Sequence, residues 1–327
     1  MIMNLLKRKR LWLALLLLAI VYITNSSLLA KPRDEAPLLL AHRGLAQTFH
    51  MEGITDETCT AERIYEPEHP YLENTLASMD AAFREGADIV EFDVQPTKDR
   101  NFVVFHDWTL DCRTNGKGVT REHTTAELKV LDIGYGYTAD GGATYPFRGK
   151  GIGMMPTLDE VMSTFPDRQF LIHVKSNDPA EGVQLAEYLQ ALPAQRLEQL
   201  TVYGGDEPIA ALSKQMPQLR TMSKASLIKF VLTYTAVGWT GYVPASIGHT
   251  QVHIPEKIAP WLWGWPTRFI NRMEDADTRV ILVGGDGREA SSGFDTPEDA
   301  AQRIPHSYTG GIWTNRIDLV APMYLNR

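Results

Sequence analysis

Two histidines with polar neighbours are the side chains of this sequence best suited to acid–base chemistry. His42 precedes Arg43, and His106 precedes Asp107, so each imidazole has a neighbour that can orient or charge it. Histidine titrates closest to neutral pH. One imidazole can therefore accept a proton from an attacking hydroxyl while the other, protonated, donates one to a leaving alkoxide. A lone histidine is more often a hydrogen-bonded structural residue, so this interpretation depends on what surrounds the pair.

A carboxylate pair is the second candidate for chemistry. Glu91 and Asp93 are separated by one residue, so on a strand both side chains point to the same side. Two carboxylates placed together repel one another unless a divalent cation lies between them, and oxygen ligands suit Mg²⁺ or Ca²⁺. Taken alone, the pair is explained at least as well by neutralisation with arginine or lysine.

Arg43 and Lys175 supply fixed positive charge that could serve the same site. A phosphodiester develops negative charge as it is cleaved, and fixed cations can hold that charge. The alternative role of both residues is to neutralise Glu91 and Asp93 without a metal. The two roles are compatible.

Short apolar runs predict the elements that must position these residues. Eight runs are typical of buried parallel strands: 38–41, 89–94, 170–175, 200–203, 219–222, 251–254, 280–283 and 311–313. Helical patterns lie between most of them, with Asn74 and Thr157 as expected caps of the first two: 74–85, 158–165, 181–192, 208–215, 226–236 and 297–303. This alternation predicts a (β/α)8 barrel, with a doubly wound sheet as the alternative.

The candidate residues lie where a barrel collects its active site, at the carboxyl ends of the strands. Polar side chains concentrate on or just after four of the predicted strands: His42 and Arg43, Glu91 and Asp93, His173 and Lys175, and residues 314–316.

Residues 102–107 break the alternation because only residues 98–101 separate them from the second strand. A loop that short cannot hold a crossover helix, so a hairpin above the barrel rim is expected. If Thr97 lies opposite Phe102, then Asp93 lies opposite His106. The returning strand is therefore predicted to bring His106 beside the carboxylates.

The first thirty residues are typical of an export or anchoring signal. Basic residues 7–10 precede the apolar run 11–23, and the basic block is expected to stay cytoplasmic. The apolar core suits a cleaved signal, but Leu28 is bulky for cleavage after Ala30, which favours an uncleaved anchor whose helix continues towards Ala30. Residues 1–30 are therefore predicted to form a signal anchor or transmembrane segment, with an extracytoplasmic (periplasmic or extracellular) catalytic domain over 38–327. Cleavage would give a secreted protein.

Charge and cysteine content bear on the possible partners of the protein and on a possible disulfide. The whole chain carries a net charge of −8, and because residues 1–30 hold four basic and no acidic residues, the remainder carries −12. No basic face for phosphate contacts is apparent, so nucleic acid is excluded as a partner. Cys59 and Cys112 either form a disulfide or remain two buried thiols, and the sequence does not choose between these. It does not predict the oligomeric state.

Seven motifs occur in a fixed order along the chain: Ala41-His42-Arg43-Gly44, Glu73-Asn74-Thr75, Glu91-Phe92-Asp93, His106-Asp107, residues 113–118 (RTNGKG), residues 156–160 (PTLDE) and residues 311–315 (GIWTN). As a set they resemble the glycerophosphodiester phosphodiesterase family, within the phospholipase C-like phosphodiesterase superfamily. The resemblance covers roughly residues 38–319.

The resemblance implies a (β/α)8 TIM barrel with a β-hairpin and loop insertions at the C-terminal face. It also implies cleavage of a phosphodiester to an alcohol and a phosphomonoester, with Mg²⁺ or Ca²⁺ as the usual metal. By position it implies acid–base roles for His42 and His106, metal ligation by Glu91 and Asp93, and phosphate contacts from Arg43 and Lys175.

Three departures from the family pattern stand out. His173 replaces the usual glutamate, and an imidazole ligand would favour Mg²⁺, Mn²⁺ or Zn²⁺ over Ca²⁺. Asp178 is the alternative third ligand. The segment between Arg43 and Glu73 is long. The tryptophan-rich stretch 261–266 either meets a lipid chain or the bilayer interface near the barrel mouth, or belongs to an extra helix that packs against the barrel.

Three functions follow, in order of preference. The first is metal-dependent hydrolysis of glycerophosphodiesters, which are deacylated phospholipids, by direct water attack or through a cyclic phosphate. The second is phospholipase D-type cleavage of lysophospholipids or sphingolipids by the same site. The third is a weakened phosphodiester-binding protein, suggested by the substitution at His173.

Overall fold

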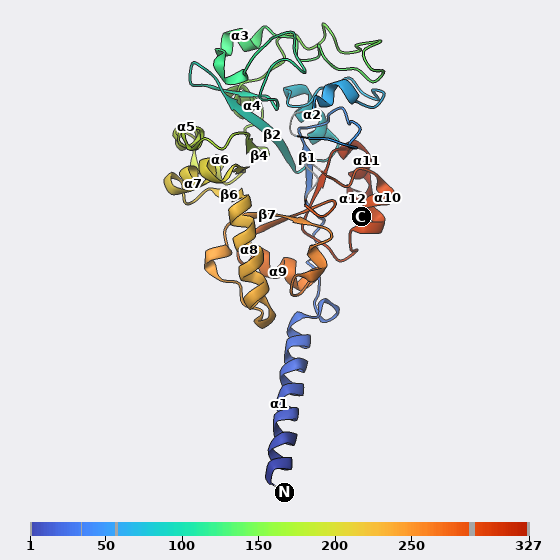
Figure 1. Cartoon of the computed structure of the whole chain (residues 1–327), viewed down its shortest axis with the longest axis vertical. Helices are drawn as coiled ribbons and strands as arrows, with labels where there is room; N and C mark the ends of the chain where they lie inside the picture. Colours follow the sequence, from blue (N-terminus) through green and yellow to red (C-terminus); the bar gives the residue numbers. More distant parts are fainter. Residues whose placement is uncertain (1, 34, 56–57, 288–291, 326–327) are drawn as a thin grey trace.

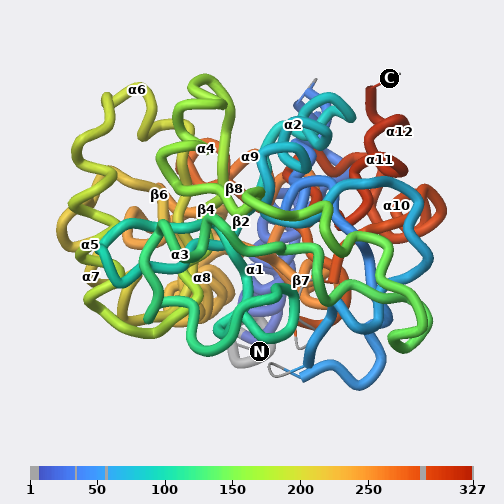
Figure 2. Tube along the Cα trace, turned by 90° about the horizontal axis from the view of Figure 1, so that it is seen from above, coloured from blue at the N-terminus to red at the C-terminus, as the bar shows by residue number. Residues whose placement is uncertain are grey.

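The computed structural model describes residues 2–33, 35–55, 58–287 and 292–325 of the 327-residue chain. Its centre is a nearly closed barrel of eight parallel strands with helices outside (Figures 1 and 2). The order around the barrel is β6-β5-β4-β2-β1-β9-β8-β7. The predicted (β/α)8 barrel is confirmed, and the doubly wound alternative is wrong.

Every predicted strand is present within one or two residues of its expected place. The barrel strands are β1 (Leu39–His42), β2 (Ile89–Pro96), β4 (Gln169–Val174), β5 (Leu200–Gly204), β6 (Arg220–Ser223), β7 (Gln251–Pro255), β8 (Arg279–Val283) and β9 (Gly311–Thr314). Their side chains are almost all buried, because helices cover the outside and the barrel interior is filled. Leu40, Ile89, Leu171, Ile281 and Trp313 form a cluster of their own.

All six predicted helices are present, and several others join them. The helices that follow the barrel strands or precede the next one are α2 (Leu76–Arg84), α4 (Leu158–Thr164), α5 (Pro179–Gln190), α6 (Ala194–Leu197), α7 (Asp206–Gln215), α8 (Lys224–Val237), α9 (Thr267–Asp275), α10 (Pro297–Arg303), α11 (Ile317–Val320) and α12 (Pro322–Leu325). Their apolar faces and the outer faces of the strands form the main hydrophobic core.

The two predicted helix caps have different outcomes. Thr157 caps α4 as expected, and its side chain accepts a hydrogen bond from the Glu160 amide in a capping box. The cap of α2 is Thr75, one residue later than predicted. Asn74 does not cap, because it adopts a left-handed φ of 59° and turns its side chain towards Asp93.

Two loop regions form a second, smaller core beside the barrel. They are residues 44–72 and 97–156, which we call the rim; the second contains α3 (Thr125–Lys129) and lies at the top of Figure 1. Their buried side chains, among them Ile64, Phe105 and Tyr137, pack together in a separate cluster. The cysteines of the rim, Cys59 and Cys112, are joined by a disulfide, which answers the question that the sequence left open.

The predicted hairpin exists, but its register is shifted by one residue. Strand β3 (Phe102–Val104) pairs antiparallel with β2, and Pro96 rather than Thr97 lies opposite Phe102. The Thr97 amide donates to the Asn101 carbonyl at 2.9 Å, so the turn is one residue tighter than expected, with Arg100 at a left-handed φ of 63°. Asp93 therefore faces Phe105, and His106 reaches the site from beyond the strand end.

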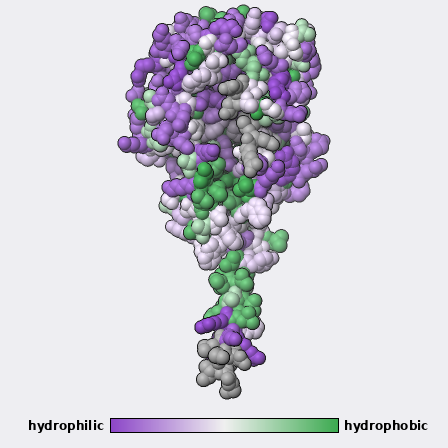
Figure 3. Space-filling view, in the orientation of Figure 1, coloured by the Kyte–Doolittle hydropathy of each residue, from purple (hydrophilic) through white to green (hydrophobic). Residues whose placement is uncertain are grey.

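The N-terminal segment forms α1 (Ile2–Asn25), which extends away from the barrel with exposed apolar side chains (Figures 1 and 3). The predicted transmembrane anchor with an extracytoplasmic domain is wrong: no helix in the described ranges is long and apolar enough to cross a bilayer. The basic residues 7–10 lie inside α1, and the helix stops at Asn25 instead of continuing to Ala30. The apolar part is thus shorter than the ~20 residues a span needs.

The tryptophan-rich stretch 261–266 follows the packing alternative for two of its three rings. Trp263 and Trp265 pack partly buried against the main core, and Trp263 Nε1 donates to the Thr235 carbonyl at 2.9 Å. Trp261 is 81% exposed. The lipid contact remains untested.

Candidate active site

Strand register brings the predicted site residues together at the carboxyl ends of three neighbouring strands. His42 on β1 lies beside Glu91 on β2, and Asp93 on β2 lies beside His173 on β4. Arg43 and Lys175 follow directly after β1 and β4, and His106 comes from the segment after β3. All seven predicted side chains therefore meet in one cluster.

Glu91, Asp93 and His173 could hold a divalent cation. Both carboxylates are completely buried, and ligand atoms of the three residues lie within 4.8 Å of one another. His173 Nδ1 lies 2.8 Å from Asp93 Oδ1. Two carboxylates and an imidazole are a donor set that Mg²⁺, Mn²⁺ or Zn²⁺ accepts, so the residues fit a metal. Asp178, the alternative ligand, instead caps α5 and pairs with Arg121.

The two carboxylates have opposite pKa shifts. Burial, together with the neighbouring Asp93, raises the pKa of Glu91 to about 8. Burial would also raise the pKa of Asp93, but Lys175 and Arg43 hold it well below its usual range. The two buried carboxylates cannot both ionise readily, because the positive charge around them is too small. A bound cation would supply that charge and favour ionisation of both.

Arg43 is held by a backbone turn and by two carboxylates. It has a left-handed φ of 59°, and Gly44 beside it has a φ of 79°, where a Cβ would overlap the backbone of Ser78. This turn places the Arg43 Nε atom 3.2 Å from Asp93 Oδ2 and its Nη1 atom 3.0 Å from Glu73 Oε1. Arg43 thus neutralises part of the carboxylate charge, as the alternative role requires, while its guanidinium stays at the site.

His42 is buried and locked in one tautomer. Its Nδ1 atom donates to Asn315 Oδ1 at 2.6 Å, and that amide is oriented because Asn315 Nδ2 donates to Asp295 Oδ2 at 2.8 Å. His42 Nε2 lies 3.8 Å from Glu91 Oε2. Burial and then the charge of Arg43 keep the pKa of His42 well below its usual value, so the ring is neutral at pH 7.

His106 is held by one carboxylate and one ammonium group. Its Nδ1 atom donates to Asp107 Oδ1 at 2.7 Å, and Lys175 Nζ lies 3.0 Å from its Nε2 atom. Burial and the charge of Arg43 lower the pKa of His106. Burial would raise the pKa of Asp107, but the guanidinium of Arg113 lowers it to about 2, so the partner of His106 stays ionised.

Sequence reasoning missed several residues that fix this cluster. Asn74 donates to Asp93 Oδ2 and accepts from the Asp93 amide, both at 3.0 Å. The Tyr203 hydroxyl donates to Glu91 Oε1 at 2.7 Å, and its ring stacks on His173 with centroids 4.1 Å apart. The position of Tyr203 at the end of a predicted strand is a signal that could identify it, whereas the sequence predicts only a helix cap at Asn74.

A cleft of ≈ 1100 Å³ opens beside His42 and Arg43. The segment 46–55 of the rim lines it on one side, and residues around Asn315 line it on another. Its wall includes apolar side chains, with Phe49, Met51 and Leu319 among them. The cleft is therefore large enough for a diester with a sizeable alcohol group.

A nearly closed parallel barrel with two imidazoles and two basic side chains around a buried carboxylate pair defines the class of barrel phosphoric-diester hydrolases. The model of the Glycerophosphoryl diester phosphodiesterase family matches residues 42–243. A glycerophosphodiester phosphodiesterase from Caldanaerobacter subterraneus is 41% identical over 235 residues, which is 66% of this chain and 86% of that protein. The chain belongs to the glycerophosphoryl diester phosphodiesterase family.

Solved structures share the fold at lower identity. A glycerophosphodiester phosphodiesterase from Agrobacterium tumefaciens matches with a TM-score of 0.53 and 23% identity, covering 88% of this chain and 99% of that one. An Oleispira antarctica phosphodiesterase, solved in complex with the product sn-glycerol-3-phosphate, matches with a TM-score of 0.53 and 18% identity over 89% and 98% of the two chains.

Proposed function

We propose that residues 38–327 form a catalytic domain that hydrolyses glycerophosphodiesters to an alcohol and glycerol phosphate. The observation that carries this proposal is the placement of His42 and His106 around one cluster that also contains Arg43 and Lys175. Family membership supports the same reaction, and the relatives named above are phosphodiesterases.

In this proposal, Glu91, Asp93 and His173 hold one divalent cation. When bound, the cation supplies positive charge to the phosphoryl oxygens of the substrate. His173 in place of a carboxylate makes the donor set less negative, which favours Mg²⁺, Mn²⁺ or Zn²⁺ over Ca²⁺. Calorimetric titration of each metal into wild type and His173→Glu tests the preference. The variant should gain Ca²⁺ affinity, and equal Ca²⁺ affinity in both proteins would contradict it.

The two imidazoles move the protons. Each ring has its Nδ1–H fixed, by Asn315 for His42 and by Asp107 for His106, which leaves Nε2 as the atom that exchanges a proton with substrate. One Nε2 accepts the proton of the attacking hydroxyl and the other, once protonated, gives one to the leaving alkoxide. Arg43 and Lys175 hold the phosphoryl oxygens as negative charge grows.

Turnover of glycerophosphocholine and glycerophosphoethanolamine tests the function directly. Release of the free alcohol and glycerol phosphate should stop with a chelator and return with added metal. Phosphorus NMR of the reaction would also detect a cyclic phosphate, which distinguishes attack by the substrate hydroxyl from attack by water. Absence of turnover by the wild type with any divalent metal would refute the function and leave the binding-protein reading.

The apolar wall of the cleft favours a second candidate, phospholipase D-type cleavage of lysophospholipids. Phe49, Met51 and Ile54 from the rim line the space beside His42, and an acyl chain would bury them. Choline release from lysophosphatidylcholine and from glycerophosphocholine, measured as kcat/KM, separates the two. A Met51→Glu variant should lose activity only on the acylated substrate, and equal losses on both would contradict the second candidate.

A further inference from the structure

One buried arginine, Arg113, connects the two halves of the proposed site. Its side chain is 3% exposed, and its Nε atom lies 3.2 Å from Asp107 Oδ2, the carboxylate that holds His106. Its Nη2 atom lies 3.4 Å from Glu73 Oε1, the carboxylate that holds Arg43. A single guanidinium thus fixes the partner of a proton-transferring imidazole and the partner of a phosphate-binding side chain.

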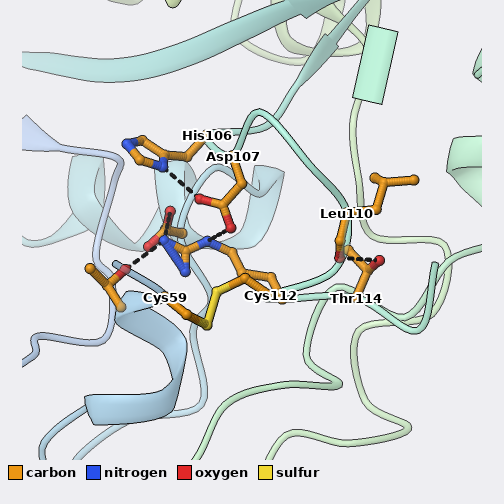
Figure 4. Close-up of a disulfide and its surroundings, with 9 residues drawn as sticks. Cys59, His106, Asp107, Leu110, Cys112 and Thr114 are labelled. Carbon is orange, nitrogen blue, oxygen red and sulfur yellow. Dashed lines mark hydrogen bonds and ion pairs between the residues drawn. A yellow bond between two sulfur atoms is a disulfide. The ribbon is translucent and has the colours of Figure 1, made fainter. Parts of the chain in front are cut away.

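The rim loop that carries Arg113 is tied to the other rim loop by the residue before Arg113 and by the Arg113 side chain. The Cys59–Cys112 disulfide joins the two rim loops (Figure 4). Arg113 directly follows Cys112, and Thr60 directly follows Cys59, so the bridge lies next to both residues. Beside the bridge, Arg113 Nη2 donates to Thr60 Oγ1 at 2.7 Å. Neither loop carries a β-ladder at this point, so the covalent bond replaces the backbone pairing that positions residues in the barrel.

Further contacts restrict the position of Arg113. The Gly136 amide donates to the Arg113 carbonyl at 3.2 Å, and a Cβ on Gly136 would overlap the Cys112 carbonyl oxygen. The guanidinium lies over the buried ring of Tyr137, with its carbon 5.7 Å from the ring centroid. Because a buried guanidinium that loses its carboxylates is costly, a shift of its backbone must carry Asp107 and Glu73 with it.

We propose that Arg113 is a positioning residue for His106 and Arg43, and that the Cys59–Cys112 disulfide keeps it in place, so that turnover depends on the bridge. The proposal rests on the function proposed above. A bridge that only stabilised the fold would lower the free energy of unfolding and leave the kcat of the folded protein unchanged. The proposal requires a loss of kcat in protein that remains folded.

Lysine cannot replace Arg113, because its single ammonium cannot contact both carboxylates as the guanidinium fork does. Arg113→Lys and Asp107→Asn should each lower kcat by roughly 10- to 100-fold, as losses of supporting partners do. The double variant should be no slower than the slower single variant, because both changes remove the same support of His106. Glu73→Gln should raise KM more than it lowers kcat, since it acts through Arg43.

Arg196→Lys is the matched control, because Arg196 is also buried and hydrogen-bonded but lies away from the site, against the Arg168 carbonyl and Gln199. It should keep wild-type kcat. All assays are made below the melting temperature of each variant. Wild-type kcat and KM in folded Arg113→Lys, or losses that multiply in the double variant, would overturn the positioning role.

The bridge is tested with Cys59→Ala plus Cys112→Ala, and with wild type that is reduced and then alkylated. Both should lower kcat by roughly 10-fold while circular dichroism shows a folded protein, and reoxidation of reduced, unalkylated enzyme should restore turnover. In Arg113→Lys, removing the bridge should cost no further kcat. Folded, bridge-free protein with full turnover would overturn the dependence on the bridge, whereas an inactive oxidised wild type would refute the function itself.

Discussion

The barrel and the rim hold their functional side chains by different physical means. In the barrel, Glu91, Asp93 and His173 stand on strands whose ladders fix each position relative to its neighbours. In the rim, His106 and Arg113 stand on irregular segments and depend on ion pairs, side-chain hydrogen bonds and one disulfide. The active-site cluster thus combines side chains held rigidly by the barrel with His106, whose position depends on a separate, smaller core.

The two regions also differ in how many interactions a local opening must break. The main core contains side chains from seven of the eight barrel strands and most helices, whereas the rim core contains about a fifth as many buried side chains. Regions with few buried apolar contacts open at lower free energy than the global unfolding reaction. The rim is therefore expected to open before the barrel.

The largest expected effect is a loss of kcat when either proposed acid–base histidine, one in each region, is replaced. His42→Ala on the barrel and His106→Ala in the rim should each lower kcat by about 10²- to 10⁴-fold, because each removes one proton-transfer group. Steady-state assays with glycerophosphocholine measure the loss. His249→Ala, outside the site and bonded to Asp277, serves as the control. If either variant kept wild-type kcat, the shared acid–base mechanism would be wrong.

Loss of the disulfide should weaken the rim selectively. The bridge closes a loop with a sequence separation of 53 residues, so its removal should cost about 4 kcal/mol by the loop-closure argument. Hydrogen exchange should show faster exchange at rim amides, such as those of Leu110 and Thr138, and little change in β2 and β4. Equal acceleration throughout the barrel would show that the two cores unfold as one.

The ion pair of Asp107 should make the stability of the rim depend on acid pH. The pKa of Asp107 falls from its ordinary 3.8 to about 2 in the folded state, so its contribution is present above pH 3.8 and is lost as the pH falls through 2. The shift corresponds to about 2 kcal/mol. Between pH 5 and pH 2, the free energy of unfolding from denaturant titrations should fall less in Asp107→Asn than in wild type. The exposed Asp167→Asn variant should follow wild type; identical slopes in all three would contradict the pairing.

The smallest expected effect comes from removing one helix cap in each region. Thr157 caps α4 beside the barrel and Thr124 caps α3 in the rim, both through capping boxes. Replacing either threonine by alanine should cost about 1 kcal/mol. Thr157→Ala should lower the global free energy of unfolding, whereas Thr124→Ala should lower only the opening free energy of the rim in hydrogen exchange. If Thr124→Ala lowered the global free energy of unfolding by the full amount, the rim and the barrel would unfold as one unit.

The barrel could be predicted from sequence because buried parallel strands are short, apolar and bounded by polar residues. The carboxylate pair also followed from local spacing, since the period of a strand puts Glu91 and Asp93 on one side. The rim was harder, because its contacts are long-range and irregular. Nothing local links Arg113 to Glu73, and the turn of the hairpin is closed by hydrogen bonds between Thr97 and Asn101 that the sequence does not reveal.

Two misinterpretations have the same physical origin. The sequence predicts a helix cap at Asn74 and a membrane helix that continues from the apolar run 11–23 towards Ala30, because local propensity is the only guide that a sequence offers. In the structure, Asn74 bonds Asp93 and Thr75 caps instead. Likewise α1 ends at Asn25, where Arg272 donates to Asn25 Oδ1 and Ser27 donates to the Gly264 carbonyl. Tertiary contacts decided both outcomes.

The pairing of β1 with β9 also joins two segments that leave the ribosome at different times. His42 belongs to the first barrel strand, whereas its amide partner Asn315 follows the last strand, 273 residues later. A nascent chain that has emerged as far as β8 therefore contains every residue of the carboxylate cluster but lacks the amide that fixes the tautomer of His42. Because domains generally fold as units during synthesis, the barrel and the fixed ring of His42 are completed only after residue 315 has emerged.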